Sequence, residues 1–320
     1  MLTRGATRRG LLVGAVLLCT SPTALLADDS TAALGAGGIE LLQSDSIAML
    51  EQDLFLAARK VRTRFVFQNE SRADIKTLVA FVMPDIEARD LARRDNDDIV
   101  DHLGFTVTVD GRKIVPKADI RARLDGKDVT DRLKQYGIAL RAGQKFRDII
   151  PQAGLTLEQK AKLRADGLLH ENFDDVPGWD TRLRLYWEQV FPAGAQVEIY
   201  HGYTPFLGTE NILPATISNV PLFTDRFCMD AAQKKAAATM LETTTGTAHY
   251  LDYILSTGSS WKGPIRRLAI TIEREHAGDM ALTCLPGLKP VGPTSAGVGY
   301  TDAKPQEDIS VLFISRGSDP

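Results

Sequence analysis

Histidines are the first residues to consider for chemistry, and the chain has five, at positions 102, 170, 201, 249 and 276. None has a second histidine three to five residues away, so the spacing typical of a metal-binding pair is absent. His170 and His201 lie close to carboxylates in the sequence. Acid-base catalysis by either would need a shaped, partly dry pocket that only the fold can assemble. From spacing alone, we predict no catalytic, cofactor-binding or metal-ligating residue.

Two aromatic-rich segments form the strongest candidate for a pocket. Leu183–Trp187 alternates apolar and polar residues, Pro192–Gly194 predicts a turn, and the alternation returns over Val197–Tyr200. This pattern predicts a hairpin of two paired strands. Aromatic residues on paired strands pack a sheet more often than they hold a ligand, so packing is the favoured role. The candidate pocket on these strands consists of Trp187, Glu188, His201 and Tyr203.

Other motifs that could carry chemistry are weak. Asp95, Asp97, Asp98 and Asp101 offer oxygens suited to calcium, but the stretch lacks the central Gly and terminal Glu of an EF-hand loop. A solvated acidic turn is therefore favoured. The chain has no Gly-x-Ser-x-Gly elbow for a serine nucleophile. The glycines of residues 35–38 do not follow a predicted buried strand, so they indicate a flexible start rather than a phosphate-binding loop.

The first 27 residues have the three parts of a secretory signal peptide. Met1–Gly10 is basic, Leu11–Cys19 is continuously apolar, and Ala24–Ala27 ends in a small residue. The apolar run is about half the roughly 20 residues that a membrane-spanning helix needs. We therefore predict cleavage after Ala27, a periplasmic location and no transmembrane segment in the mature chain. Thr7–Leu12 also resembles a twin-arginine motif, so export by either that route or the Sec route is expected.

Two cysteines, Cys228 and Cys284, remain after removal of the signal peptide. In an oxidising compartment such a pair predicts a disulfide, and two buried free thiols are the alternative. No Cys-x-x-Cys motif supports a thioredoxin-type redox role.

Alternating apolar residues predict a β-rich first part. Val61–Phe67 and Ile75–Met83 are expected to be two strands joined by a polar turn. Phe105–Val109 leads through Asp110 and Gly111 to Lys113–Val115, which is a strong hairpin signal. These segments favour antiparallel sheet.

A helical insertion is expected over about residues 117–175. Thr130 begins a short helix that carries Leu133 and Tyr136 and stops at Gly137. A second helix opens with the capping box of residues 156–159 and ends near Gly167.

The last hundred residues mix helix and strand. Asp230 is expected to cap a helix that runs to Leu241, and His249–Leu255 to form another helical turn or two. Leu268–Ile272 and Ile309–Ile314 alternate like strands.

These elements predict an α+β fold. An antiparallel, β-sandwich-like sheet over residues 28–220 carries the helical insertion, and a disulfide-tied α+β part follows over residues 221–320. With 44% hydrophobic and 25% charged residues, the 320-residue chain has the composition of a globular protein. A net charge of −3 argues against general binding of nucleic acid.

Several longer segments follow one another in a characteristic order: Gly37–Ile39, Ser46–Met49, Val61–Asn69, Leu78–Ile86, Phe227–Asp230, Tyr253–Gly258, Trp261–Ile265 and Cys284. Together with the export signal, they resemble the exported bacterial family called domain of unknown function 4424, over nearly all of the mature chain. The resemblance implies an exported protein of unassigned activity and supplies no catalytic residue.

The expected function is therefore that of a non-catalytic envelope protein that binds a protein partner or a small ligand. The alternative is a periplasmic hydrolase whose site the fold would assemble from dispersed His, Asp and Glu residues, with His201 or His170 at its centre.

Overall fold

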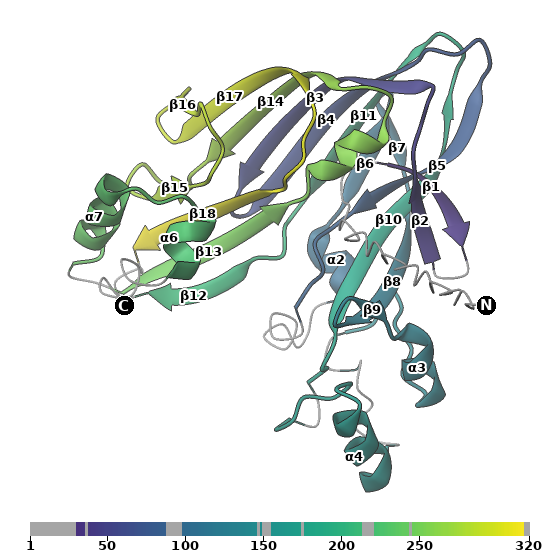
Figure 1. Cartoon of the computed structure of the whole chain (residues 1–320), viewed down its shortest axis with the longest axis vertical. Helices are drawn as coiled ribbons and strands as arrows, with labels where there is room; N and C mark the ends of the chain where they lie inside the picture. The colour runs from purple at the N-terminus through teal and green to yellow at the C-terminus, as the bar shows by residue number, and fades with distance from the viewer. Residues whose placement is uncertain are drawn as a thin grey trace, which may run out of the picture.

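The computed structural model describes residues 30–35, 38–87, 98–145, 148, 155–173, 176–212, 221–242 and 245–316. The predicted signal peptide lies outside these residues, as do Asp95 and Asp97 of the acidic stretch. The described chain is mostly β, and nearly all of its strand pairs are antiparallel (Figure 1). The expected antiparallel sheet is therefore confirmed, while helices make up a smaller part of the described chain than an α+β class implies.

The first sheet has six strands in the order β2-β1-β5-β10-β8-β9. Their bounds are Gly38–Leu42 for β2, Ser30–Gly35 for β1, Ile75–Val82 for β5, Asp180–Phe191 for β10, Lys117–Leu124 for β8 and Lys127–Asp128 for β9. Gly35 ends β1 and Gly38 begins β2, and the two strands pair with each other, so a flexible start is the wrong description of these two residues. The reason is long-range: β5 supplies backbone partners for β1, which the spacing of the glycines does not indicate.

The second sheet has eight strands in the order β16-β17-β14-β3-β4-β11-β6-β7. The bounds are Lys289–Pro290 for β16, Ser295–Ala303 for β17, Ile265–Glu273 for β14, Ile47–Ala57 for β3, Lys60–Asn69 for β4, Gln196–Tyr203 for β11, Thr106–Val109 for β6 and Arg112–Ile114 for β7. The hairpin of β6 and β7 is confirmed, and its turn residues Asp110 and Gly111 have φ of 47° and 75°. The pair β14–β3 is parallel.

The two sheets pack face to face through one core. Along β10 the residues alternate between buried and more exposed, so that Leu183, Leu185 and Trp187 point inward. Phe67 of the second sheet contacts Phe191 of the first, with ring centroids 5.8 Å apart. Burial of this apolar surface is the main term that stabilises the pairing of the sheets.

The third sheet has four strands, in the order β12-β13-β18-β15, with two helices beside it (Figure 1). The strands span Gly208–Ile212, Gly246–Tyr253, Ile309–Arg316 and Met280–Leu282, and the helices are α6 (Pro221–Arg226) and α7 (Ala231–Met240). Asp230 caps α7 as predicted, through a capping box with Gln233. A disulfide joins Cys228 to Cys284, which confirms the predicted bridge.

Two sequence expectations need correction. His249–Leu255 belongs largely to the strand β13, because β18 supplies backbone partners along all of β13 and β12 along Gly246–Tyr250. The strands β10 and β11 lie in different sheets, so their turn carries the chain from one sheet to the other instead of closing the expected hairpin. The two strands expected over residues 61–83, β4 and β5, are confirmed, and they also lie in different sheets.

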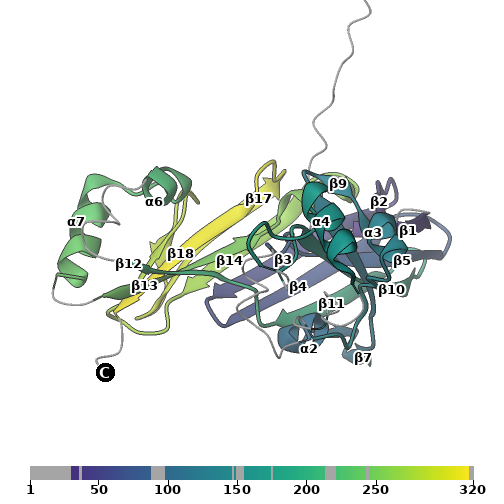
Figure 2. The same cartoon turned by 90° about the horizontal axis from the view of Figure 1, so that it is seen from below.

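The helical insertion is shorter than expected. Its helices α3 (Thr130–Gln135) and α4 (Leu157–Ala165) are present, and α4 has the predicted capping box. Residues 117–124, however, form β8, whose apolar residues Ala118, Ile120 and Ala122 alternate with charged ones. That period of two is a strand signal. Figures 1 and 2 show α3 and α4 beside β8 and β9, far from α6 and α7.

Asp98 belongs to helix α2 (Ile99–Leu103) as its N-cap, which explains part of the acidic stretch. Its Oδ1 accepts hydrogen bonds from the backbone N–H groups of Val100 and Asp101, both at 2.9 Å. We expect Asp98→Ala to lower the free energy of unfolding by about 1 kcal/mol. Urea denaturation measures this, with the exposed, non-capping Asp101→Ala as the matched control. Equal losses in both variants would contradict a capping role.

Candidate functional site

The structure places His201 inside the main core. Its side chain is 0% exposed, and its ring centroid lies 5.2 to 5.5 Å from those of Phe65, Phe81, Phe105 and Trp187. Burial lowers the pKa of His201 from 6.5 to about 3. His201 is thus a neutral core residue that a substrate from solvent cannot reach.

Of the other three residues of the predicted pocket, two lie in the core and one lies on the outer surface of the first sheet. Trp187 and Tyr203 are buried near His201, from opposite sheets. Glu188 follows Trp187 on β10 and therefore points the other way, to the surface, where it forms an ion pair with Lys76 at 2.9 Å. The lysine also lowers the pKa of the Glu188 carboxyl. The fold brings three of the four residues together as packing and leaves Glu188 outside.

The remaining four histidines lie in separate local contacts. The ring centroid of His102 is 4.7 Å from that of Phe206, and His170 follows α4 and packs beside Phe173. His249 is 3.0 Å from the hydroxyl of Thr209, and His276 is 3.2 Å from Asp279. Within the described residues, no three His, Cys, Asp or Glu side chains are grouped as a metal would require.

A different cavity gathers charged side chains on the outer face of the first sheet. Arg121 and Arg123 come from β8, and Arg182 and Arg184 from the neighbouring strand β10. Arg182 lies directly opposite Arg121 in the register. Residues two apart on a strand share a face, so all four guanidinium groups are presented on one side. We call the space that they line the arginine cavity. Its volume is about 750 Å³, and it is open to solvent on one side.

Two of these arginines are neutralised within the protein. Arg182 donates two hydrogen bonds to the carboxylate of Asp85, at 2.7 and 2.8 Å. Arg121 pairs with Asp119 at 3.1 Å and lies 3.8 Å from Asp128. Bidentate and charge-assisted pairs of this kind fix the side chains in place.

The other two, Arg123 and Arg184, donate to backbone carbonyls instead, those of Gly126 and Ile39. In the part of the chain that the structure describes, neither is within ion-pair distance of a carboxylate. Both side chains are half-buried. Burial, with repulsion from Arg182, lowers the pKa of Arg184 from its usual range. A bound anion would relieve this unfavourable charge.

The strand β2 forms one border of the cavity and is held there by polar side chains. The backbone N–H of Ile39 donates to Asp119 at 3.1 Å, and its carbonyl accepts from Arg184. The side chains of Asp119 and Arg184 therefore satisfy backbone hydrogen-bonding groups of β2 that a neighbouring strand would otherwise pair with. Behind this edge, Ile39 packs with Ala32 and Ala80 in a small separate core.

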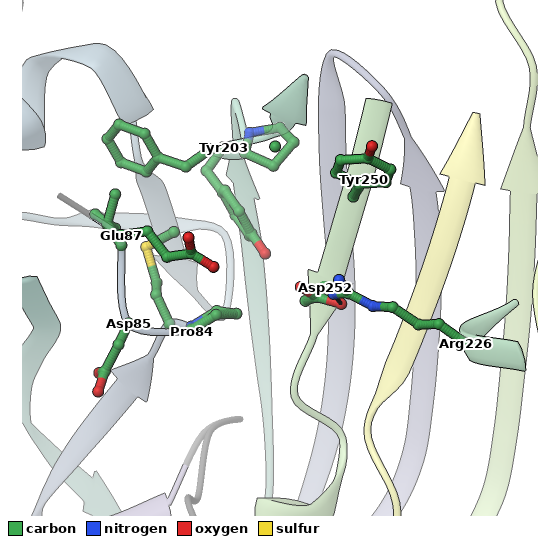
Figure 3. Close-up of a pocket in the computed structure, with 12 residues that line it drawn as sticks. Pro84, Asp85, Glu87, Tyr203, Arg226, Tyr250 and Asp252 are labelled. Atoms are coloured by element: carbon green, nitrogen blue, oxygen red, sulfur yellow. Dashed lines mark hydrogen bonds and ion pairs between the residues drawn. The ribbon is translucent and has the colours of Figure 1, made fainter. Parts of the chain in front are cut away.

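The third sheet supplies a second wall to the arginine cavity, with Asp252, Ile254, Asp308 and Ser310 at the ends of β13 and β18. A smaller recess of about 90 Å³ adjoins it and shares Met83, Pro84, Asp85 and Asp252 with it. Figure 3 shows Arg226 reaching Asp252 across the recess from Asp85. The nitrogen of Arg226 is 2.6 Å from the Asp252 carboxylate. Asp252 is therefore a neutralised member of this wall.

Sequence reasoning missed the arginine cavity. The signal was present as two arginines spaced by two residues on each of two segments, Arg121 with Arg123 and Arg182 with Arg184. This spacing places the four arginines on one face only if both segments are strands that pair with each other, as β8 and β10 do.

No helix within the described residues is both long and apolar enough to cross a membrane. Among curated proteins, none matches this chain.

Among solved structures, the chain is similar to a Legionella pneumophila protein provisionally described as nutrient-binding. The identity is 12% and the TM-score 0.42, over 89% of this chain and 72% of that one. It is also similar to an M1 zinc metallopeptidase from Deinococcus radiodurans, with 7% identity and a TM-score of 0.25, over 86% of this chain and 43% of the peptidase. This chain thus spans less than half of the peptidase.

The residues that suggested a family in the sequence lie within one continuous match to a family model. That model covers residues 27–312 and includes every strand of the three sheets except the last residues of β18. The chain therefore belongs to the family described as domain of unknown function (DUF4424).

Proposed function

We propose that this protein is an exported, non-catalytic binding protein of the periplasm, and that it holds a small anionic ligand in the arginine cavity. The observation that carries the proposal is the pair Arg123 and Arg184, two half-buried guanidinium groups on adjacent strands without a carboxylate partner in the described chain. Their donors match the oxygens of a carboxylate or phosphate.

The surroundings support a preformed site. The two neighbouring arginines are fixed by Asp85 and Asp119, and the edge of β2 is fixed by Asp119 and Arg184. A ligand that enters such a site does not have to order its binding groups, which lowers the entropic cost of binding. Export is supported by the three-part signal of residues 1–27.

Thermal unfolding in the presence of glutarate or inorganic phosphate tests the site. Either anion is expected to raise the unfolding temperature of the wild type, because a ligand that binds only the folded state stabilises it by about 2.7 kcal/mol at 100 times its Kd. Arg184→Gln and Arg123→Gln should each weaken the binding at least about tenfold, the loss of one charged hydrogen-bond donor.

Arg59→Gln is the matched control, since Arg59 has an 82% exposed side chain, does not line the cavity and forms an ion pair with Glu275 at the surface. It should respond to the anions as the wild type does. The proposal fails if neither anion stabilises the wild type, or if both cavity variants bind as tightly as Arg59→Gln.

A further inference from the structure

The arginine cavity contains unpaired negative charge as well as unpaired positive charge. Of the ionisable side chains that line it, three acids are already neutralised: Asp85 by Arg182, Asp128 partly by Arg121, and Asp252 by Arg226. The lining residues that keep an uncompensated charge within the described chain are Arg123, Arg184, Glu40 and Asp308.

These four charges lie at two depths. Arg123 and Arg184 are half-buried, on the sheet that forms the floor of the cavity. Glu40 and Asp308 also line the cavity but are exposed to solvent, and we call them the rim carboxylates. A ligand that satisfies all four would have its anionic end inside and its cationic end towards solvent.

Asp308 is positioned to accept from such a ligand. Its Oδ1 accepts hydrogen bonds from the backbone N–H groups of Leu255 and Ser256, both at 3.1 Å, which fixes the carboxylate. Within the described chain, no donor lies within hydrogen-bond distance of its Oδ2. This oxygen is free to receive an ammonium group.

Glu40 lines the cavity next to the strand edge that Arg184 contacts. It follows Ile39 in β2, and the carbonyl of Ile39 is the acceptor of Arg184. An anion held by Arg184 therefore lies near the residue next to Glu40. In a short zwitterion, a few bonds separate the carboxylate from the ammonium group, which suits this arrangement.

We infer that the ligand is zwitterionic, an amino acid or a short peptide, with its carboxylate between Arg123 and Arg184 and its ammonium group facing Asp308 and Glu40. The inference rests on the proposed function, since it names the class of anion that the arginine cavity binds. A dianion such as phosphate or a dicarboxylate would satisfy the arginines equally well. It would, however, add a second negative charge close to the two rim carboxylates.

L-Glutamate and glutarate test this inference because they share both carboxylates and differ by the ammonium group. In isothermal titration of the full mature chain at one pH and salt concentration, we expect L-glutamate to bind about tenfold more tightly than glutarate, the effect of one well-placed charged interaction. The double variant Asp308→Asn, Glu40→Gln should abolish this preference and leave glutarate binding unchanged or tighter. Asparagine retains an Oδ1 that can accept from Leu255 and Ser256.

The control is Glu275→Gln, which removes a surface carboxylate outside the cavity and should keep the preference. Glutarate binding as tightly as L-glutamate in the wild type would overturn the inference and leave the proposed anion site standing. A preference that persists in the double variant would overturn the placement of the ammonium group. If neither compound binds but inorganic phosphate stabilises the wild type, the inference is overturned and the anion site stands. If phosphate also has no effect, the proposed function itself fails. Glu40→Gln alone provides the same comparison if the double variant does not fold.

Discussion

Lowering the pH from 7 to 4 should destabilise the wild-type protein by about 3 kcal/mol more than it destabilises a His201→Leu variant. The reason is the position of His201 in the core, where burial lowers its pKa from 6.5 to about 3. Between these two values the unfolded chain binds a proton at residue 201 and the folded protein does not. Stability from this residue is therefore complete above pH 6.5 and is lost progressively as the pH falls towards 3.

Urea unfolding at pH 7, 6, 5 and 4 measures the difference. Carboxylates with lowered pKa, such as Glu51 and Glu70, also cost stability in acid, but they do so in every variant and cancel in the comparison. His276→Leu is the control, because His276 is exposed and its loss should leave the wild-type pH profile intact. Identical profiles for the wild type and His201→Leu would show that the imidazole is not held neutral in the core.

Reduction of the disulfide should lower the free energy of unfolding by about 4 kcal/mol, on the chain-entropy model for a loop of this length. Cys228 and Cys284 are separated by 56 positions, and their bridge ties the start of α7 to the end of β15. Around it, Phe227 and Met229 pack into a second apolar cluster with Leu282 and Leu312. Release of the bridge therefore also loosens that cluster.

The measurement is urea unfolding with and without a reducing agent, with hydrogen exchange to locate the change. Protection should fall first over residues 221–242. The Cys228→Ser, Cys284→Ser double variant is the control, since it should match the reduced wild type and not respond to the reducing agent. An unchanged urea midpoint after complete reduction would contradict a stabilising role for the bridge.

Local features of this fold could be predicted from the sequence because they depend on neighbouring residues. The turn at Asp110 and Gly111 needs two residues that tolerate positive φ, and both adopt it. The caps at Thr156 and Asp230 follow from a side chain that meets an N–H three residues later. The disulfide followed from the cysteine count and the expected oxidising compartment.

The pairing of strands could not be predicted in the same way. β10 and β11 do not pair with each other, because each has partners far away in the chain. β10 pairs with β5 and β8, and β11 pairs with β4 and β6. The alternation placed Trp187 and His201 on buried faces, but it did not show that those faces belong to opposite sheets.

The arginine cavity was hidden for the same reason. It is built from β2, β8, β10 and the ends of β13 and β18, which lie more than 250 residues apart in the sequence at their extremes. Each contributes a charged residue that looks like an ordinary surface residue by itself. Two features of the fold bring these residues into one site. The pairing of β8 with β10 places Arg182 opposite Arg121, and the carbonyl of Ile39 in β2 accepts a hydrogen bond from Arg184.

Native mass spectrometry of the protein from the exported fraction tests whether the arginine cavity holds a ligand. We expect a chain that begins after Ala27 and carries a small ligand, released on denaturation, in the wild type and in Arg59→Gln. The same preparation of Arg184→Gln should carry little or none of it. A bare wild-type protein, or a ligand that Arg184→Gln retains in full, would contradict binding in the arginine cavity.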